Sequence, residues 1–340
     1  MKKNAYFCIS KQPIAVSRLT FKEVNMTDQE LKQEIQRLKR EKNAVVLGHY
    51  YCRHEIQELS DYVGDSLALS QEAQRAEADI IVFCGVHFMA ETAKILNPTR
   101  KVLLPDMEAS CSLAESCKAD DFAAFKAEHP DHMVISYINC SAEIKALSDL
   151  ICTSGNAEKL VRSLPEEQKI IFAPDKNLGG YINQVTGRQM LLWNGVCMVH
   201  DAMQAEAILK LKAEHPDAPV VAHPECNAAL LRVADFVGST KAMLNYIKAS
   251  SARQFIVATE TGILYEMKRE NPDKEFITLH DDKNCACDDC AYMKLNTLEK
   301  LHRCLRDGGP EIDLPVETLD AARRPIVRML EMSRQLGIIK

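Results

Sequence analysis

Three cysteines and one histidine are the residues of this sequence best suited to metal chemistry. The stretch 193–200 places the thiol of Cys197 shortly after a glycine and three residues before His200. Thiolate and imidazole groups are typical ligands of soft and borderline metals. Cys111 lies 86 residues before Cys197, and Cys290 lies 93 residues after it. Because each of these cysteines closes a segment of similar make-up, we expect the three thiols to face one shared site.

A C-x-C-x-x-C motif, formed by Cys285, Cys287 and Cys290, is dense enough to bind metal by itself. A structural zinc site or a set of reducible thiols is therefore one interpretation. A ferredoxin-type site would need all its ligands close together in the sequence. One cysteine per segment would instead give three ligands to a cube-shaped iron–sulfur cluster and leave one iron open. An open iron is a Lewis acid that can bind an oxygen and assist the loss of water.

Titratable side chains follow apolar runs in two of the segments. His223 and Glu225 place a base two residues from a carboxylate, which suits acid–base chemistry if burial tunes their pKa values. His49 and Tyr51 follow the apolar run 44–47 in the same way. Each side chain alone could equally be a hydrogen-bonded core residue. Their shared position after predicted strands favours a catalytic site.

Hydroxyl side chains stand where predicted strands lead into helices. Ser66, Ser154 and Thr240 occupy such places, one in each segment. Hydroxyls and free N–H groups at helix N-termini bind phosphate or carboxylate groups. Simple capping of each helix is the alternative for any one of them. Three in similar places predict a substrate that carries several acidic groups.

Short apolar runs alternate with helical segments along most of the chain. We expect strands at 44–47, 79–85 and 101–106, then at 133–139, 150–156 and 169–175, and finally at 219–225, 236–240, 254–262 and 275–280. This alternation predicts an α/β fold with parallel sheets, whose ligands lie beyond the C-terminal ends of the strands. The polar residues expected at those ends are His49, Tyr51, Ser66, Tyr137, Asn139, Ser154, His223, Glu225 and Thr240.

The threefold recurrence of this order predicts three αβα domains with small parallel sheets. A pseudo-threefold axis would relate them, with the active site at their central junction. We expect an N-terminal extension and helix at 1–40, domains at 41–118, 119–205 and 206–292, and a helical tail at 293–340 that packs back on the first domain. The first helix should begin at Thr27, because Glu30 completes a capping box.

Composition narrows the class of protein. The 340 residues carry a net charge of −6, which gives no reason to expect a nucleic acid or an anionic membrane as partner. No apolar run approaches the roughly 20 residues that span a bilayer. An odd number of cysteines, 13, without an export signal argues against a disulfide framework. We therefore expect a cytoplasmic protein.

Taken together, these motifs resemble the quinolinate synthase family. The resemblance lies in His49-Tyr50-Tyr51, Gly64-Asp65-Ser66, Tyr137-Ile138-Asn139, Trp193-Asn194-Gly195-x-Cys197-x-Val199-His200, His223-Pro224-Glu225, Gly238-Ser239-Thr240 and Cys290-Ala291-Tyr292-Met293-Lys294-Leu295-Asn296. It implies one 4Fe-4S cluster with three cysteine ligands, Cys111, Cys197 and Cys290, and one open iron. Cys285 and Cys287 are extra, and their C-x-C spacing departs from the C-x-x-C-x-x-C that is usual in related forms.

The resemblance also implies a reaction and roles for residues. Iminoaspartate would condense with dihydroxyacetone phosphate, releasing phosphate and two waters, to give quinolinate for NAD biosynthesis. The enzyme would be a transferase, and its imine substrate could come from L-aspartate oxidase. Glu225, Tyr51 and His223 would be catalytic. Substrate-binding residues would be His49, Ser66, Tyr137, Asn139, Ser154, His200, His223, Glu225 and Thr240.

Two other classes of protein remain open from the residues alone. A zinc-stabilised binding module would be colourless and contain zinc. A metal-free, aldolase-like enzyme would form a Schiff base on a lysine at a strand end, and Lys176 is the one candidate.

Overall fold

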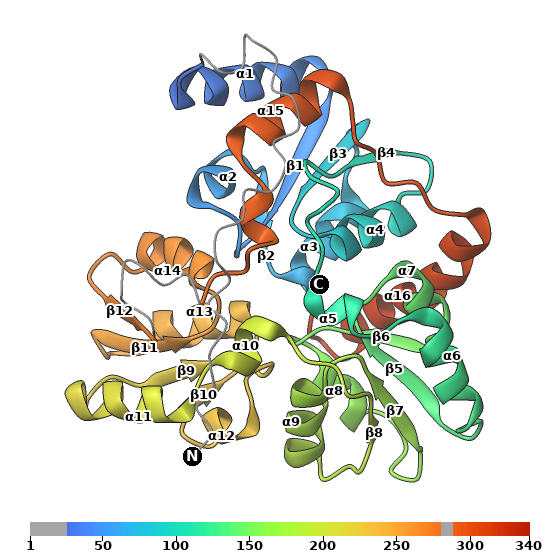
Figure 1. Cartoon of the computed structure of the whole chain (residues 1–340), viewed down its shortest axis with the longest axis vertical. Coiled ribbons are helices and arrows are strands. Elements are labelled where there is room, and N and C mark those ends of the chain that lie inside the picture. The colour runs from blue at the N-terminus through green and yellow to red at the C-terminus, as the bar shows by residue number, and fades with distance from the viewer. Residues whose placement is uncertain (1–25, 280–287) are drawn as a thin grey trace, which may run out of the picture.

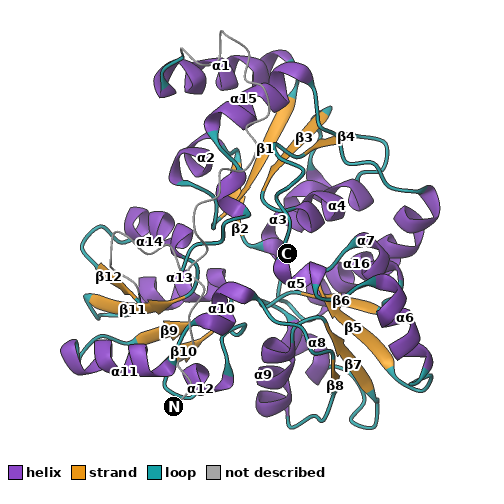
Figure 2. Ribbon diagram, viewed as in Figure 1, coloured by secondary structure: helices purple, strands orange, loops and turns teal. Residues whose placement is uncertain are grey.

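The structure is a computed structural model that describes residues 26–279 and 288–340. Three α/β units surround a common centre (Figure 1), and helices flank the strands of each unit (Figure 2). The first unit has strands β1 (Ala44–His49), β2 (Tyr62–Gly64), β3 (Ile80–Cys84) and β4 (Lys101–Leu103). Its helices are α1 (Asp28–Glu41), α2 (His54–Leu59), α3 (Ser66–Arg75), α4 (His87–Leu96) and α5 (Ser112–Glu115).

The second and third units follow in the chain. The second has strands β5 (Met133–Tyr137), β6 (Leu150–Cys152), β7 (Ile170–Ala173) and β8 (Leu191–Leu192), and helices α6 (Ala119–Ala127), α7 (Ala142–Ala146), α8 (Ala157–Arg162), α9 (Lys176–Thr186) and α10 (Met198–Ala202). The third has strands β9 (Val220–Ala222), β10 (Phe236–Val237), β11 (Gln254–Ala258) and β12 (Glu275–Thr278). Its helices are α11 (Ala205–Glu214), α12 (Ala228–Leu231), α13 (Thr240–Ala249), η2 (Thr261–Ile263) and α14 (Leu264–Glu270).

Each unit contains a parallel sheet of four strands. The strand orders are β2-β1-β3-β4, β6-β5-β7-β8 and β10-β9-β11-β12, so the same order occurs three times. The predicted α/β class with three small parallel sheets is confirmed. Sequence reasoning missed β2 and β8, which are only three and two residues long. The predicted domain boundaries stay a prediction.

One aspartate per sheet joins the first two strands in the same way. Its carboxylate accepts the backbone N–H of a valine in the first strand, and its own N–H donates to that valine's carbonyl. The pairs are Asp61 with Val46, Asp149 with Val134, and Asp235 with Val220, with carboxylate bonds of 2.7, 2.7 and 2.8 Å. These valines therefore mark equivalent positions in the three sheets.

The N-terminal helix α1 begins as predicted. Thr27 Oγ1 accepts the N–H of Glu30 at 3.3 Å, and the Glu30 carboxylate accepts the N–H of Thr27 at 2.7 Å. The two bonds make a capping box, which satisfies N–H groups that the first turn leaves free. Leu31, Ile35 and Leu38 form the buried face of this helix.

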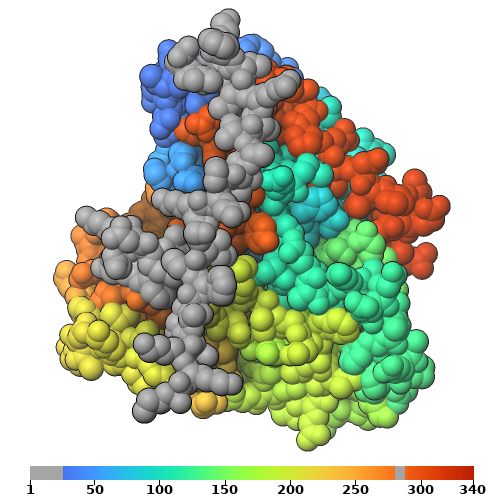
Figure 3. Space-filling model, viewed as in Figure 1, coloured from blue at the N-terminus to red at the C-terminus, as the bar shows by residue number. Residues whose placement is uncertain are grey.

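A C-terminal tail follows the third unit and contains η3 (Met293–Leu295), α15 (Leu298–Asp307) and α16 (Val316–Gln335). Helix α15 packs against α1. Helix α16 packs mainly against α7 and β6 of the second unit, and also against α4. In Figure 3 the red tail borders both the blue-to-teal and the green regions. Among the described helices, none is long and apolar enough to cross a membrane.

Candidate active site

The threefold repeat places the predicted site residues at equivalent positions. Counting from the three marker valines, the third residue is His49, Tyr137 or His223, the fifth is Tyr51, Asn139 or Glu225, and the twentieth is Ser66, Ser154 or Thr240. The sixth is a buried cysteine in all three units: Cys52, Cys140 and Cys226. Equivalent positions after the strands β1, β5 and β9 therefore carry side chains of different chemical type.

Glu225 is the centre of the hydrogen-bond network. Tyr137 Oη donates to Glu225 Oε1 at 2.5 Å, and Asn139 Nδ2 lies 3.4 Å from the same oxygen. His200 Nδ1 lies 3.0 Å from Glu225 Oε2. The second and third units are joined here, because Tyr137 ends β5, Asn139 follows it and His200 lies on α10, whereas Glu225 follows β9.

Electrostatics keep Glu225 charged although it is buried. Burial raises the pKa of its carboxyl group, but the imidazole of His200 and the hydrogen bond from Tyr137 outweigh this and hold the pKa well below its usual range. Burial lowers the pKa of His49 and of His223 to about 3. Both imidazoles are therefore neutral near pH 7. The site combines one carboxylate with neutral hydrogen-bonding rings.

Asp175, which was not among the predicted site residues, adds a second acidic group. It follows β7, and its Oδ1 accepts the N–H groups of Asn177 and Leu178 at 2.7 and 3.0 Å. Its Oδ2 is buried without a hydrogen-bond partner in the described structure. Burial, and then the charge of Glu225, raise the pKa of Asp175 well above its usual range. A protonated acid therefore lies close to an ionised one.

Thr259, also missed from the sequence, links two of the predicted residues. Its Oγ1 lies 2.8 Å from Tyr51 Oη and 2.9 Å from His200 Nε2. Thr259 follows β11 directly, inside the range 254–262 that the sequence predicts as strand. A hydroxyl within a predicted strand gave no signal of function.

The predicted helix-start residues approach one another at the unit junctions. Ser154 Oγ lies 3.2 Å from His223 Nε2. A side chain added at Gly155 would lie 3.5 Å from Ser239 Oγ and 3.8 Å from Leu67. The residues just before α8 and α13 and the first turn of α3 therefore lie near one another.

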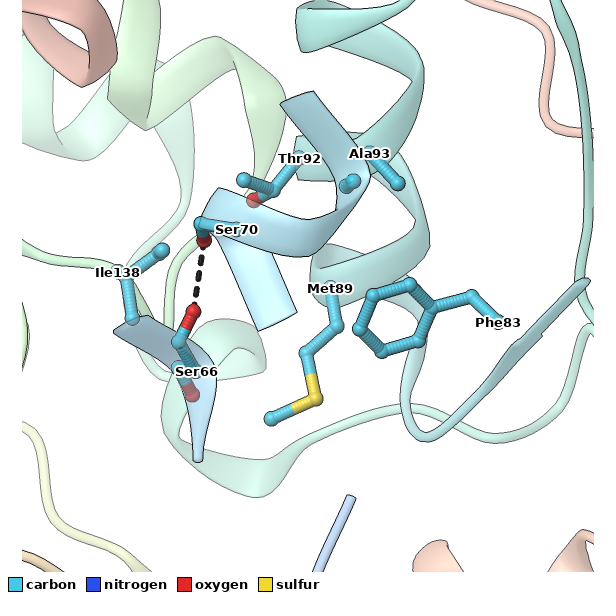
Figure 4. A pocket seen from close by; sticks show the side chains of 8 residues that line it. Ser66, Ser70, Phe83, Met89, Thr92, Ala93 and Ile138 are labelled. Carbon is cyan, nitrogen blue, oxygen red and sulfur yellow. Dashed lines mark hydrogen bonds between the residues drawn. The ribbon is translucent and has the colours of Figure 1, made fainter. Parts of the chain in front are cut away.

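Ser66 lies at the wall of a small cavity (Figure 4). The cavity has a volume of about 10 Å³, which is about the size of one water. Met89 of α4 and Ile138, which follows β5, also line it. Ser70 Oγ donates to the carbonyl of Ser66 at 2.7 Å. Ser66 therefore borders the contact between the first and second units.

The three predicted thiols belong to loops that meet. The N–H of Met198 donates to Ser112 Oγ at 3.2 Å, which joins the loops of Cys197 and Cys111. Cys197 and Cys290 pack against the same apolar cluster of the third unit. Burial raises the pKa of Cys111 to about 12, and the Cys290 thiol contributes further. Cys285 and Cys287 lie outside the described residues.

One described group of side chains has the geometry to hold a metal ion. Cys197, His200 and Glu225 each offer one ligand atom, and these atoms lie within 4.8 Å of one another. His200 Nδ1 lies 3.2 Å from Cys197 Sγ. Burial, followed by the charge of Glu225 and by Cys111, raises the pKa of Cys197 well above its usual range. A cation here would favour the thiolate and relieve the cost of burying it.

A buried ion pair supports this region from behind. Lys294 Nζ lies 2.7 Å from Glu260 Oε1 and donates to the carbonyl of Tyr51 at 2.9 Å. The same Glu260 oxygen accepts the N–H of Cys290 at 3.0 Å. Lys294 belongs to the motif that follows Cys290 in the sequence. One ion pair therefore anchors the backbone of a predicted metal ligand and of a predicted catalytic residue.

Comparison with known proteins decides the family. A sequence profile described as Quinolinate synthetase A protein matches residues 33–331. The chain belongs to this family. It is 59% identical over 299 residues to a quinolinate synthase of Microcystis aeruginosa, covering 88% of this chain and 94% of that protein. It is 60% identical over 305 residues to one of Thermosynechococcus vestitus, covering 89% and 96%. A third, from Chloroherpeton thalassium, is 56% identical over 327 residues, covering 96% and 98%.

The range matched by the quinolinate synthetase family includes every residue predicted for the site. Lys176, which the Schiff-base alternative requires, is exposed at the start of α9. Schiff-base lysines depend on burial to lose their proton. This alternative therefore lacks the environment that it needs.

Proposed function

We propose that this chain is a quinolinate synthase that condenses iminoaspartate with dihydroxyacetone phosphate. The products would be quinolinate, phosphate and two waters, and the reaction would serve NAD biosynthesis. The observation that carries the proposal is the convergence of Tyr137, His200 and Glu225 beside Cys197, within a chain of this family.

The donor set fits a 4Fe-4S cluster held by Cys111, Cys197 and Cys290. Each thiol is partly buried, and each lies in or next to a different unit. Burial is the main cause that raises the pKa of all three thiols. Neighbouring thiols in such an environment ionise readily only beside a cationic group. When bound, a cluster with three cysteine ligands supplies an open iron that acts as a Lewis acid toward a substrate oxygen.

Anionic groups of the substrates would bind at the helix starts. Ser66, Ser154 and Thr240 would supply hydroxyl and N–H donors to phosphate and carboxylate oxygens. His49 and His223 would donate hydrogen bonds as neutral rings, since burial lowers the pKa of each to about 3. The site would then hold a polyanion without large numbers of lysine and arginine side chains.

Proton transfer would fall to Glu225 and Tyr51. The ionised Glu225 carboxylate is a base whose position is set by Tyr137, Asn139 and His200. His223 Nδ1 lies 3.8 Å from Glu225 Oε1 and would adjust its orientation. Burial, then the charge of Glu225, raise the pKa of Tyr51 well above its usual value, so Tyr51 would remain a neutral phenol near pH 7.

The decisive experiment purifies the protein without air and measures iron, acid-labile sulfide and quinolinate formation. We expect about four irons and four sulfides per chain. Cys197→Ala should lose both the cluster and turnover, whereas Cys304→Ala, a buried cysteine of α15, should keep them. A colourless protein that contains zinc and forms no quinolinate would support a zinc-stabilised module instead. Location in the cytoplasm and supply of the imine by L-aspartate oxidase belong to the same proposal.

A further inference from the structure

We propose that Thr259 is a positioning residue for the reaction, because its hydroxyl bridges the phenol of Tyr51 and the imidazole of His200. Thr259 is 1% exposed, and its Oγ1 lies 2.8 Å from Tyr51 Oη and 2.9 Å from His200 Nε2. The consequence is that the Tyr51 oxygen and the His200 ring are held in one arrangement next to Glu225. This inference rests on the proposed function and assigns a role to a residue outside the predicted site.

His200 connects the Thr259 hydroxyl to the centre of the site. Its Nδ1 lies 3.0 Å from Glu225 Oε2 and 3.2 Å from Cys197 Sγ. Glu225 already receives hydrogen bonds from Tyr137 and Asn139, as an accepting carboxylate does. The ring that Thr259 contacts through Nε2 therefore lies against the Glu225 carboxylate and the Cys197 sulfur on its other side.

The Thr259 hydroxyl can contact both groups at once. A hydroxyl has one hydrogen to donate and lone pairs that accept, so it can bind two partners at once. Thr259 Oγ1 lies within hydrogen-bond distance of both Tyr51 Oη and His200 Nε2. Removal of the hydroxyl would take this shared partner away from the phenol and from the imidazole.

Comparison within the chain shows that the fold does not need a hydroxyl here. The third strand in the order of each sheet is β3, β7 or β11, and these strands end at matching places. Their last residues pair with the residue two positions after the marker valine, and they are Cys84, Ala173 and Ala258. The residue that follows is Thr259 in the third unit, but Gly85 and Pro174 in the other two. The threefold architecture is therefore complete without this side chain, and the hydroxyl appears only where Tyr51 and His200 meet it.

Thr259→Val and Thr259→Ser separate the hydroxyl from the shape of the side chain. Valine keeps the volume and removes the hydroxyl, while serine keeps the hydroxyl. We expect Thr259→Val to lower kcat by about 10- to 100-fold, as for the loss of one hydrogen bond at a charged network. KM for dihydroxyacetone phosphate should change less than about twofold, because the anion-binding helix starts are untouched. Thr259→Ser should recover most of kcat.

The control is Thr278→Val, the same change at another buried threonine of the third sheet. Iron and sulfide content and the melting temperature are measured for every variant. The inference is overturned if Thr259→Val keeps kcat within about twofold of the parent, or if Thr259→Ser is as slow as valine at equal cluster content. If valine prevents folding, Thr259→Ala removes the hydroxyl without adding a methyl group in its place, and kcat should again fall while Thr259→Ser recovers most of it. Failure of the parent protein to form quinolinate would instead refute the proposed function.

Discussion

Replacement of Glu225 by glutamine tests the centre of the site with the smallest change of shape. The carboxylate accepts from Tyr137 through Oε1 and from His200 through Oε2. A glutamine oxygen can keep the first bond, but its NH₂ group would then face the N–H of His200. One charge-assisted hydrogen bond is lost and two donors are opposed.

The magnitude follows from these contacts. A hydrogen bond to a charged group contributes about 1.5–3 kcal/mol, which corresponds to about 10- to 150-fold in the population of the correct geometry. Loss of a positioned general base lowers rates by about 100- to 10,000-fold. We therefore expect Glu225→Gln to lower kcat by at least about 100-fold. Its iron and sulfide content should match that of the parent, because the three proposed cysteine ligands remain.

The assay is quinolinate formation without air, with iron and sulfide measured on the same samples. Glu266→Gln is the matched control, because Glu266 is also buried but pairs with Arg269 on α14. The control should keep its activity. A Glu225→Gln protein with a full cluster and a kcat within about threefold of the parent would refute the role of Glu225 as base.

Three further changes test the supporting structure. Lys294→Met should lower the free energy of unfolding, measured in urea, by about 3–5 kcal/mol, because it leaves the Glu260 carboxylate buried without its cation. Lys248→Met, at an exposed ion pair, should lower it by only about 0–1 kcal/mol. Equal urea midpoints for the two variants would contradict this expectation. Burial lowers the pKa of His49 to about 3, so its contribution to stability is complete above pH 6.5 and is lost as the pH falls toward 3. His49→Gln should therefore reduce the slope of unfolding free energy between pH 6 and 4 by about 1.4 kcal/mol per pH unit, and an unchanged slope would argue against a neutral buried ring. Asp235→Ala should cost about 1–3 kcal/mol in urea by leaving a strand N–H without its acceptor, and an unshifted midpoint would show that the aspartate is dispensable.

Part of the architecture can be predicted from the sequence, because local patterns of residues specify it. Apolar runs such as 133–139 indicate buried strands, and the Thr27 capping box indicates the start of α1. Strands β2 and β8 were missed because their few residues pair with a neighbour that no local pattern identifies. The marker valines with their aspartates offered an overlooked signal, since a valine fifteen residues before an aspartate recurs in each unit.

The sequence by itself determined the repeated α/β plan and the types of side chain at the strand ends, because alternating apolar runs and short polar motifs are properties of neighbouring residues. Only the tertiary structure decided which of these side chains touch. Thr259 is 208 residues from Tyr51 and 59 from His200, yet one hydroxyl contacts both. Such contacts depend on how three sheets pack, and side-chain packing between distant elements leaves no periodic trace in the chain.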